Sequence, residues 1–334
     1  MSPPIRRDAA PSAWPSALPS SLSYEDALAW VRREAAAAGF GGVVRVEPQK
    51  VSDRSVVLRV VTRADSLFFK AGAGLAHHEA PLTAYLSRRH PAHVPAVVAF
   101  DTDRRWMLMR QVRGPTLMST PLVSGWQGAF ETLGRIQCDL SGAVDDLFEL
   151  GCYQRTLPSL TRYLDAFLPQ WCAREDVTDA ERRRLADAAA IWTQLCRQPI
   201  PGLPAATLDH ADLHPRNIVV STSGPVYLDW EGGAIGHPFW SPLILLGYVD
   251  RLVPDVAGAR DELRAAYLRP WTAFLPMTDL IRAFEQVRPL ASLKYAFGLW
   301  RFLTHGAPGP EKDALQRTIR ACLESALSAT ETVP

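Results

Sequence analysis

The spacing of apolar residues changes along this chain, from helical spacing to the short runs that are typical of strands, and then back to helical spacing. Between Ser23, a suitable helix N-cap, and Gly39, apolar residues recur every three or four positions and predict a first helix. Three short runs of β-branched and aromatic residues then predict strands, with turn residues between them, at 43–46, 56–61 and 67–69.

A further helix is predicted over about 75–89. Two short apolar runs at 97–100 and 106–109 then predict a strand pair, joined by the turn residues Asp101-Thr102-Asp103. The dipeptide Gly114-Pro115 ends this β-rich part of the chain and is a natural linker.

The second half of the chain is predominantly helical. Thr178-Asp179-Ala180-Glu181 has the form of a capping box and predicts the start of a helix. The segment 205–230 contains the one strand pair that the pattern predicts in this half. We therefore predict an α+β fold with three parts: a flexible N-terminal arm at 1–22, a small β-rich N-lobe at 23–113 and a larger, mainly helical C-lobe at 114–334.

Composition narrows the classes of protein to consider. The chain has 334 residues, 47% of them hydrophobic and 21% charged, as expected for a globular protein of two lobes. Its formal net charge of +1 gives no electrostatic reason to expect nucleic acid or membrane binding. The start of the chain lacks the apolar core of a secretory signal, and the five scattered cysteines suggest neither a zinc site nor a disulfide framework. We expect a cytoplasmic enzyme, as a monomer or a homodimer.

The most informative stretch lies in the predicted strand pair. It reads L-D-H-A-D-L-H-P-R-N-I-V-V and, after a short turn, V-Y-L-D-W-E. Asp212 is followed five residues later by Asn217, and Asp229 lies twelve residues beyond that. Carboxylate and amide oxygens are hard ligands that suit Mg²⁺, and a carboxylate can orient an attacking hydroxyl. This set of groups is therefore typical of phosphoryl transfer.

The motif also resembles a known family. H-x-D-L-H-P-x-N resembles the catalytic loop of the protein kinase-like superfamily, and D-W-E resembles the metal-binding triplet of its small-molecule branch, the aminoglycoside phosphotransferase and choline kinase family. The resemblance implies a two-lobed protein kinase-like fold, ATP and Mg²⁺ as cofactors, and transfer of a phosphoryl group to a hydroxyl of a small molecule. It assigns Asp212 as the catalytic acid and Asn217 and Asp229 as metal ligands.

The same resemblance points to residues upstream. A lysine should end the third strand of the N-lobe, and Lys70 is the only lysine in those strands. Glu79 follows nine residues later and would hold Lys70 in place while Lys70 contacts the nucleotide phosphates. The strand that ends at Met109, with Arg110 and Gln111 after it, would form the hinge, and backbone groups of Met109 and Gln111 would bind the adenine edge.

Other positions near the motif have two interpretations. His214 could contact the transferred phosphate or pack the loop, whereas His210 is expected to brace the loop backbone. Glu231 and Arg216 flank the motif and could touch substrate or metal, or be solvated. Trp230 is expected to pack.

The resemblance fails in two places that bear on function. The predicted loop at 47–55 has no glycine, so Ser52, Arg54 and Ser55 would have to bind the phosphates that a glycine-rich loop usually holds. Downstream, where the family commonly carries G-D-P-x-x-D-L, His237 and Ser241 stand at the acidic positions. We expect the missing acids to have braced the lobe or neighboured the acceptor.

The acceptor is therefore open. An aminoglycoside is a polycation and should bind an acidic cleft, and one acidic cluster could supply it or could simply be a solvated helix end: Asp139, Asp145, Asp146 and Glu149. Sugars, nucleosides and amino alcohols are further acceptors that the family suggests. The alternative functions are a non-catalytic, nucleotide-binding regulatory protein on the same scaffold, and a protein kinase. D-W-E in place of D-F-G argues against the protein kinase.

Overall fold

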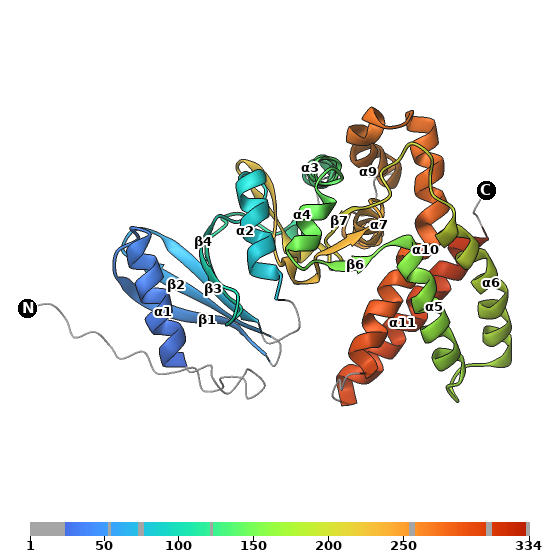
Figure 1. The fold of residues 1–334 in the computed structure, drawn as a ribbon, viewed down its shortest axis with the longest axis horizontal. Helices are drawn as coiled ribbons and strands as arrows, with labels where there is room; N and C mark the ends of the chain where they lie inside the picture. The colour runs from blue at the N-terminus through green and yellow to red at the C-terminus, as the bar shows by residue number, and fades with distance from the viewer. Residues whose placement is uncertain are drawn as a thin grey trace, which may run out of the picture. The chain divides into compact units, whose positions relative to one another are not determined.

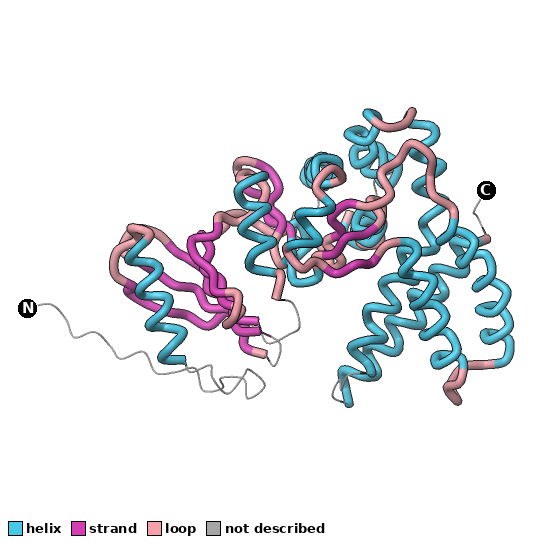
Figure 2. The backbone as a smooth tube through the Cα atoms, in the orientation of Figure 1, coloured by secondary structure: helices cyan, strands magenta, loops and turns pink. Residues whose placement is uncertain are grey.

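The computed structural model describes residues 24–52, 55–72, 77–120, 123–253, 258–304 and 309–331. The chain divides into two compact units, each of which is described by itself. Unit 1 consists of Met1–Pro115 and Val219–Gly232, and unit 2 of Thr116–Ile218 and Gly233–Pro334. Strands predominate in unit 1 and helices in unit 2, as predicted for an α+β chain (Figures 1 and 2).

Unit 1 is built on a five-stranded antiparallel sheet with the strand order β1-β2-β3-β5-β4. The strands are β1 (Val43–Val51), β2 (Ser55–Thr62), β3 (Ser66–Gly72), β4 (Val97–Asp101) and β5 (Trp106–Arg110). All five predicted strands are present, although their bounds differ. The hairpin of β8 (Ile218–Ser221) and β9 (Gly224–Tyr227) and the short helix η3 (Trp230–Gly232) complete the unit.

Two helices accompany the sheet. Helix α1 (Tyr24–Ala37) packs its apolar side on the sheet, where Trp30 makes edge or tilted contacts with Phe69 and Trp106 at centroid distances of 6.0 and 5.6 Å (Figure 1). Gly39, with φ of 80°, follows α1 in the left-handed conformation that glycine tolerates, as predicted for a helix end. Helix α2 (Glu79–Arg89) begins later than predicted and contacts β4 and η3.

The β1–β2 hairpin corrects the predicted loop at 47–55. Strand β1 continues to Val51 and β2 begins at Ser55, so only three residues join them. The register shifts between Pro48 and Lys50, where β1 carries an irregularity. Most of β1 is exposed because it is an edge strand, and its second half therefore lacks the apolar alternation by which the pattern located the other strands.

Unit 2 is mainly helical. Its longer helices are α3 (Val123–Leu140), α5 (Leu157–Cys172), α6 (Asp179–Arg197), α9 (Ala259–Leu268), α10 (Met277–Thr304) and α11 (Gly309–Thr330), and its shorter ones are α4 (Val144–Glu149), α7 (Trp240–Leu246) and α8 (Val249–Leu252). Helices α5, α6, α10 and α11 share one apolar core that contains Trp171, Trp192 and Trp240, each at most 1% exposed.

A small sheet in unit 2 was not predicted. Strands β6 (Tyr153–Arg155), β10 (Ala234–Gly236) and β7 (Thr207–Asp209) pair in the order β6-β10-β7, with β10 parallel to β6 and antiparallel to β7. The expectation of a single strand pair in this half of the chain is therefore wrong. Three residues are too few to show periodicity, so the pattern could not reveal β6 or β10. The sheet matters because β7 leads directly into the motif at Asp212.

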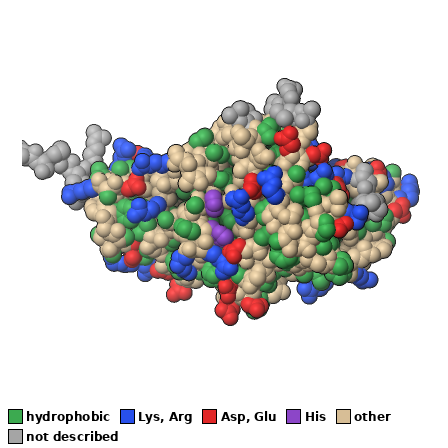
Figure 3. Space-filling view, turned by 90° about the horizontal axis from the view of Figure 1, so that it is seen from above, with side chains coloured by type: hydrophobic (Ala, Val, Ile, Leu, Met, Phe, Trp, Pro, Cys, Tyr) green, Lys and Arg blue, Asp and Glu red, His purple; other side chains and the backbone are tan. Residues whose placement is uncertain are grey.

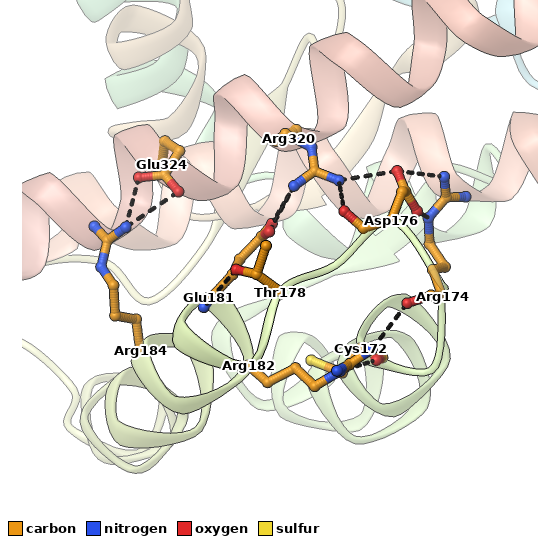
Figure 4. Close-up of polar contacts among 9 residues, drawn as sticks. All are labelled: Cys172, Arg174, Asp176, Thr178, Glu181, Arg182, Arg184, Arg320 and Glu324. Carbon is orange, nitrogen blue, oxygen red and sulfur yellow. Dashed lines mark hydrogen bonds and ion pairs between the residues drawn. The ribbon is translucent and has the colours of Figure 1, made fainter.

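Polar contacts fasten the start of α6 to α11 (Figure 4). The predicted cap is present, since the Glu181 N–H donates to Thr178 Oγ1 at 3.2 Å. The Glu181 carboxylate accepts from Arg320 Nη1 at 2.5 and 2.7 Å. Arg320 Nη2 donates to both the carboxylate and the carbonyl oxygen of Asp176, at 2.9 and 3.0 Å. Arg320 therefore ties α11 to the cap of α6 at several points.

We expect Arg320→Ala to lower the free energy of unfolding by about 1–2 kcal/mol, because Glu181 is only 11% exposed and loses its charged donor. Arg184→Ala is a matched control: it removes an ion pair between the same two helices, but both of its partners are about half exposed. The control should change stability by about 0–0.5 kcal/mol in urea unfolding. Equal losses in the two variants would contradict the role given to Arg320.

The surface carries charges of both signs. Figure 3 shows Lys and Arg side chains interspersed with Asp and Glu side chains on the face in view, in line with a formal net charge of +1. Among the described residues, none of the helices combines the length and the apolarity that crossing a bilayer requires.

Candidate active site

Lys70 lies in the middle of the unit 1 sheet. It stands on β3 opposite Val57 of β2 and Met107 of β5, and it is 7% exposed. A strand flanked on both sides has little freedom to move, so the sheet fixes the base of this side chain.

Three carboxylates of unit 1 surround the Lys70 amino group. Nζ donates to Glu79 Oε1 of α2 at 2.5 Å and to Asp229 Oδ1 at 2.6 Å, and Glu231 Oε2 lies at 3.8 Å. The structure thus brings together three residues that the sequence predicted. It adds Glu231, for which the sequence left contact and solvation open; its position two residues after Asp229 was the available signal.

Burial and charge compete at this cluster. Burial by itself would lower the pKa of Lys70, but Glu79, Asp229 and Glu231 outweigh it and raise that pKa. Burial also raises the pKa of Glu79 to about 7, although the positive charge of Lys70 opposes the shift. Lys70 therefore remains charged at neutral pH, and Glu79 titrates near neutrality.

In the D-W-E segment, the buried Trp230 lies between the two acids and fixes the backbone that carries them. Trp230 is 1% exposed and donates from Nε1 to Tyr227 O at 3.2 Å, which agrees with the packing role predicted for it. Asp229 has φ of 62°, a conformation that few residues other than glycine adopt. Carboxylate oxygens of Glu79, Asp229 and Glu231 lie within 4.8 Å of one another, and such hard donors suit Mg²⁺.

In the hairpin and the hinge, hydrogen bonds within the protein already occupy some of the groups that were predicted to bind the nucleotide. Ser52 Oγ accepts from the Ser55 N–H and contacts Ser55 O, so it helps to close the β1–β2 turn. Arg54 lies outside the described residues. The Gln111 N–H donates to Ser66 O at 3.1 Å, so an adenine contact at Gln111 would use its carbonyl oxygen. Met109 pairs with both β3 and β4.

The remaining motif residues lie on one loop of unit 2. Asp212 is exposed, and its carbonyl oxygen accepts from the His214 N–H and from Asn217 Nδ2, each at 3.0 Å. This leaves the Asn217 side-chain oxygen as the atom that could bind a cation. His214 Nδ1 accepts from the Arg216 N–H at 3.1 Å, so one ring nitrogen packs the loop. His210 is 1% exposed, in line with a bracing role.

The predicted residues thus form two groups. Lys70, Glu79 and Asp229 meet in unit 1, whereas Asp212, His214 and Asn217 share a loop of unit 2. Their joint action in one reaction stays a prediction.

Comparison with known proteins decides the family. A model of the phosphotransferase enzyme family matches residues 38–284, which is more than half of the chain. The chain belongs to this family. The match spans both groups of residues and confirms the resemblance inferred from H-x-D-L-H-P-x-N and D-W-E, together with the expectation of a small-molecule kinase at the level of the family. No curated protein matches the chain significantly.

Solved structures of phosphotransferases resemble the chain over most of its length. A protein of Ralstonia eutropha JMP134, provisionally described as an aminoglycoside phosphotransferase, is 14% identical with a TM-score of 0.67, and the match covers 92% of this chain and 98% of that one. For macrolide 2'-phosphotransferase MphH from Brachybacterium faecium the values are 15%, 0.57, 92% and 98%. For choline kinase LicA from Streptococcus pneumoniae they are 12%, 0.59, 91% and 100%. At identities this low, the structural similarity shows the fold alone. It confirms the predicted protein kinase-like fold.

In this phosphotransferase, two tyrosines that the sequence analysis did not single out neighbour the Asp212 loop. Burial raises the pKa of Tyr248, at the N-cap of α8, and of Tyr295 in α10, and the charge of Asp212 adds to both shifts. The Arg251 guanidinium lies 5.3 Å from the centroid of the Tyr248 ring.

The residues of the acidic cluster are exposed. They are Asp139, Asp145, Asp146 and Glu149, and two of them occupy the first turn of α4. Acids at that position stabilise a helix start, which agrees with the solvated interpretation.

The two family positions that lack acids are both buried in unit 2. Ser241 is 1% exposed and bonds to the start of the Asp212 loop. His237 is 2% exposed, its Nδ1 accepts from the Phe239 N–H at 3.2 Å, and burial lowers its pKa to about 3 although Asp209 opposes the shift. His237 is therefore neutral at neutral pH.

Acid should destabilise the fold through His237. Between its folded pKa of about 3 and its ordinary value of 6.5 the unfolded chain binds the extra proton, so stability is lost as pH falls from 6.5 towards 3. At pH 5 the loss from this group is about 2 kcal/mol. His237→Asn keeps an acceptor for the Phe239 N–H and removes the titration. Unfolding at pH 7 and pH 5 should show a smaller pH-dependent loss in this variant, and an unchanged difference would contradict the assignment.

Proposed function

We propose that this chain is an ATP- and Mg²⁺-dependent phosphotransferase that moves the γ-phosphoryl group of the nucleotide to a hydroxyl of a small molecule. One observation carries the proposal: the Lys70 amino group is held between Glu79 and Asp229 at 2.5 and 2.6 Å. A lysine fixed in a sheet, charged and oriented by a buried glutamate, suits the binding of nucleotide phosphates.

Each site residue has a separate proposed role. Lys70 would bind the nucleotide phosphates and Glu79 would orient Lys70. Asp229 and the Asn217 side-chain oxygen would hold Mg²⁺, with Glu231 available as a further carboxylate. Bound Mg²⁺ would neutralise charge on the transferred group. Asp212 would accept the proton of the acceptor hydroxyl and orient its oxygen for attack. This requires the two units to act together in the reaction.

The β1–β2 turn must bind phosphate without glycine. Backbone N–H groups of a turn can bind a phosphate where they do not already donate a hydrogen bond. Among the described residues of the turn, the Ser52 and Ser55 N–H groups both donate hydrogen bonds within it, so we propose that Lys70 makes most of the phosphate contact.

The acceptor is proposed as a class. The neighbours of Asp212 in unit 2 include Tyr248 and Tyr295, so we propose that aromatic rings and hydroxyls neighbour an acceptor that is a small hydroxyl compound other than a polycation. The exposed acids of α4 lie at a helix start, and this favours a solvated role over a site for a polycation. A sugar, a nucleoside, a macrolide-like antibiotic or an amino alcohol remains within this class.

A coupled ADP-release assay tests the proposal directly. Purified protein is mixed with Mg·ATP and, one at a time, with hydroxylated antibiotics, sugars, nucleosides and amino alcohols. We expect at least one acceptor to stimulate ADP release, a mass increase of one phosphoryl group in that acceptor, and loss of both signals with EDTA. Binding of Mg·ATP with neither acceptor-stimulated release nor hydrolysis would instead favour a regulatory nucleotide-binding protein.

A further inference from the structure

A buried ion pair lies where β7 ends and the Asp212 loop begins. Asp209, the last residue of β7, is 0% exposed, and its Oδ2 accepts from Nζ of Lys294 in α10, which is 5% exposed. Neither residue belongs to the motif groups described above. Removing two charges from water costs several kcal/mol. Their mutual attraction offsets this cost only when further hydrogen bonds satisfy both groups.

Those hydrogen bonds lead to the loop backbone. Asp209 Oδ1 accepts from Ser241 Oγ at 2.6 Å and from the Ala211 N–H at 3.2 Å. Ser241 Oγ in turn accepts from the His210 N–H at 3.0 Å. The two backbone N–H groups immediately before Asp212 are thus both held by this cluster, which consists of Asp209, Ser241 and Lys294.

The held segment contains an unfavourable backbone conformation. Ala211 has φ of 64°, in the left-handed region that costs a residue with a Cβ about 1–2 kcal/mol. The Asp212 side chain projects from the next residue of the backbone. Without the cluster, Ala211 would relax towards a negative φ and change the direction in which the Asp212 side chain projects.

The charge of the cluster suits this task. Burial would raise the pKa of Asp209, but Lys294 and the Ser241 hydroxyl overcome it and lower that pKa, so the carboxylate is ionised and accepts hydrogen bonds strongly. The Ser241 hydroxyl can donate to Asp209 and accept from His210 at once, which a carboxylate at that position could not do. The acid missing from α7 is thus compensated by an acid on β7.

We propose that Asp209, Ser241 and Lys294 are positioning residues for phosphoryl transfer, which fix the backbone from which Asp212 projects. The proposal rests on the catalytic role proposed for Asp212. It goes beyond a contribution to folding, because a misplacement of about 1 Å in a catalytic group can cost about 100-fold in rate.

Ser241→Ala is the sharpest variant, because it removes both hydroxyl hydrogen bonds and leaves the Asp209–Lys294 pair intact. Hydrolysis of Mg·ATP, with water as acceptor, is the readout. We expect kcat to fall between about 10-fold and 100-fold, with Kd for Mg·ATP unchanged. Ser241→Cys, which keeps a weak donor and acceptor, should give an intermediate kcat.

A matched control separates positioning from stability. Ser159 of α5 is 4% exposed in the same unit, and its hydroxyl donates to Thr156 O at 2.8 Å. Ser159→Ala should lower the free energy of unfolding by about 0.5–1.5 kcal/mol, less than Ser241→Ala, which also loses a hydrogen bond to a charged carboxylate, and should leave kcat unchanged. Equal effects of both variants on kcat would overturn the proposal, and so would a kcat for Ser241→Cys below that of Ser241→Ala.

Combination with Asp212→Asn completes the test. If Ser241 acts through Asp212, adding Ser241→Ala to Asp212→Asn lowers the residual rate no further; a full additional loss would overturn the positioning role. The proposed function fails separately, if Asp212→Asn alone leaves hydrolysis unchanged. Loss in Asp212→Asn with wild-type kcat in Ser241→Ala would refute this inference and leave the proposed function standing.

Discussion

Replacing Asp212 with asparagine is expected to lower kcat for phosphoryl transfer by about 100-fold to 10,000-fold. The amide keeps the size and can still orient the acceptor, but it cannot take up the hydroxyl proton. Asp212 is exposed, and the loop is held by hydrogen bonds from the His214 N–H and Asn217 Nδ2 to its carbonyl oxygen, which the substitution leaves in place. Stability should therefore change little, and single-turnover transfer to the best acceptor measures the effect.

Two controls accompany this variant. Affinity for Mg·ATP, by calorimetry, should stay within about threefold of wild type, since Asp212 is not proposed to bind the nucleotide. Asp145→Asn, an exposed carboxylate of the same unit on α4, should leave kcat unchanged. Wild-type turnover in Asp212→Asn would remove the residue from the mechanism.

Replacing Lys70 with methionine is expected to have the second large effect. It removes the cation shared by Glu79, Asp229 and Glu231, so a buried glutamate is left beside two like charges. At pH 8, with EDTA present, we expect the free energy of unfolding to fall by about 3–5 kcal/mol. ATP-dependent transfer should fall below detection, because the nucleotide phosphates lose their cation.

The stability loss in Lys70→Met should depend on pH in a defined direction. The folded pKa of Glu79 already lies near 7, above its ordinary 4.5, and removing Lys70 raises it further. The folded state then binds more protons than the unfolded state above pH 4.5, so stability rises as pH falls from 8 to 6. Urea unfolding at the two pH values measures this, and a larger deficit at pH 6 would contradict it.

A double variant distinguishes stability from activity. Adding Glu79→Gln to Lys70→Met removes the buried charge and should recover most of the lost stability at pH 8. Transfer activity should stay absent, since no cation has been restored. Recovery of both would mean that Lys70 only balances charge.

Local sequence was sufficient to find the parts of the site that follow one another along the chain. Asp212, Asn217 and Asp229 share a motif whose spacing carries chemistry. The family resemblance pointed to Lys70, and the rarity of lysine in this chain supported that assignment. The five strands of the β1–β5 sheet were found because short β-branched and aromatic runs recur between turn residues. Strand β1 was predicted too short because, at the edge of the sheet, its second half has no apolar face to show.

Other features had no local signal. The strands β6 and β10 have three residues each, and they pair in parallel with Tyr153 opposite Ala234, 81 residues apart in sequence. Ser241 was noticed as a missing acid, but its partner Asp209 precedes the motif without any pattern of its own, and Lys294 lies 85 residues further along. Nothing local distinguishes a lysine that will be buried from one that will be solvated.

The sequence by itself determined the family, the α+β class and the chemical groups available for phosphoryl transfer, because these depend on residue types at short spacing. Only the tertiary structure decided that Lys70 lies among three carboxylates, that Glu79 titrates near neutrality, and that a buried aspartate and lysine hold the backbone before Asp212. Burial and charge act through space, and a pKa or a held conformation results from neighbours that folding brings together across distances no spacing along the chain records.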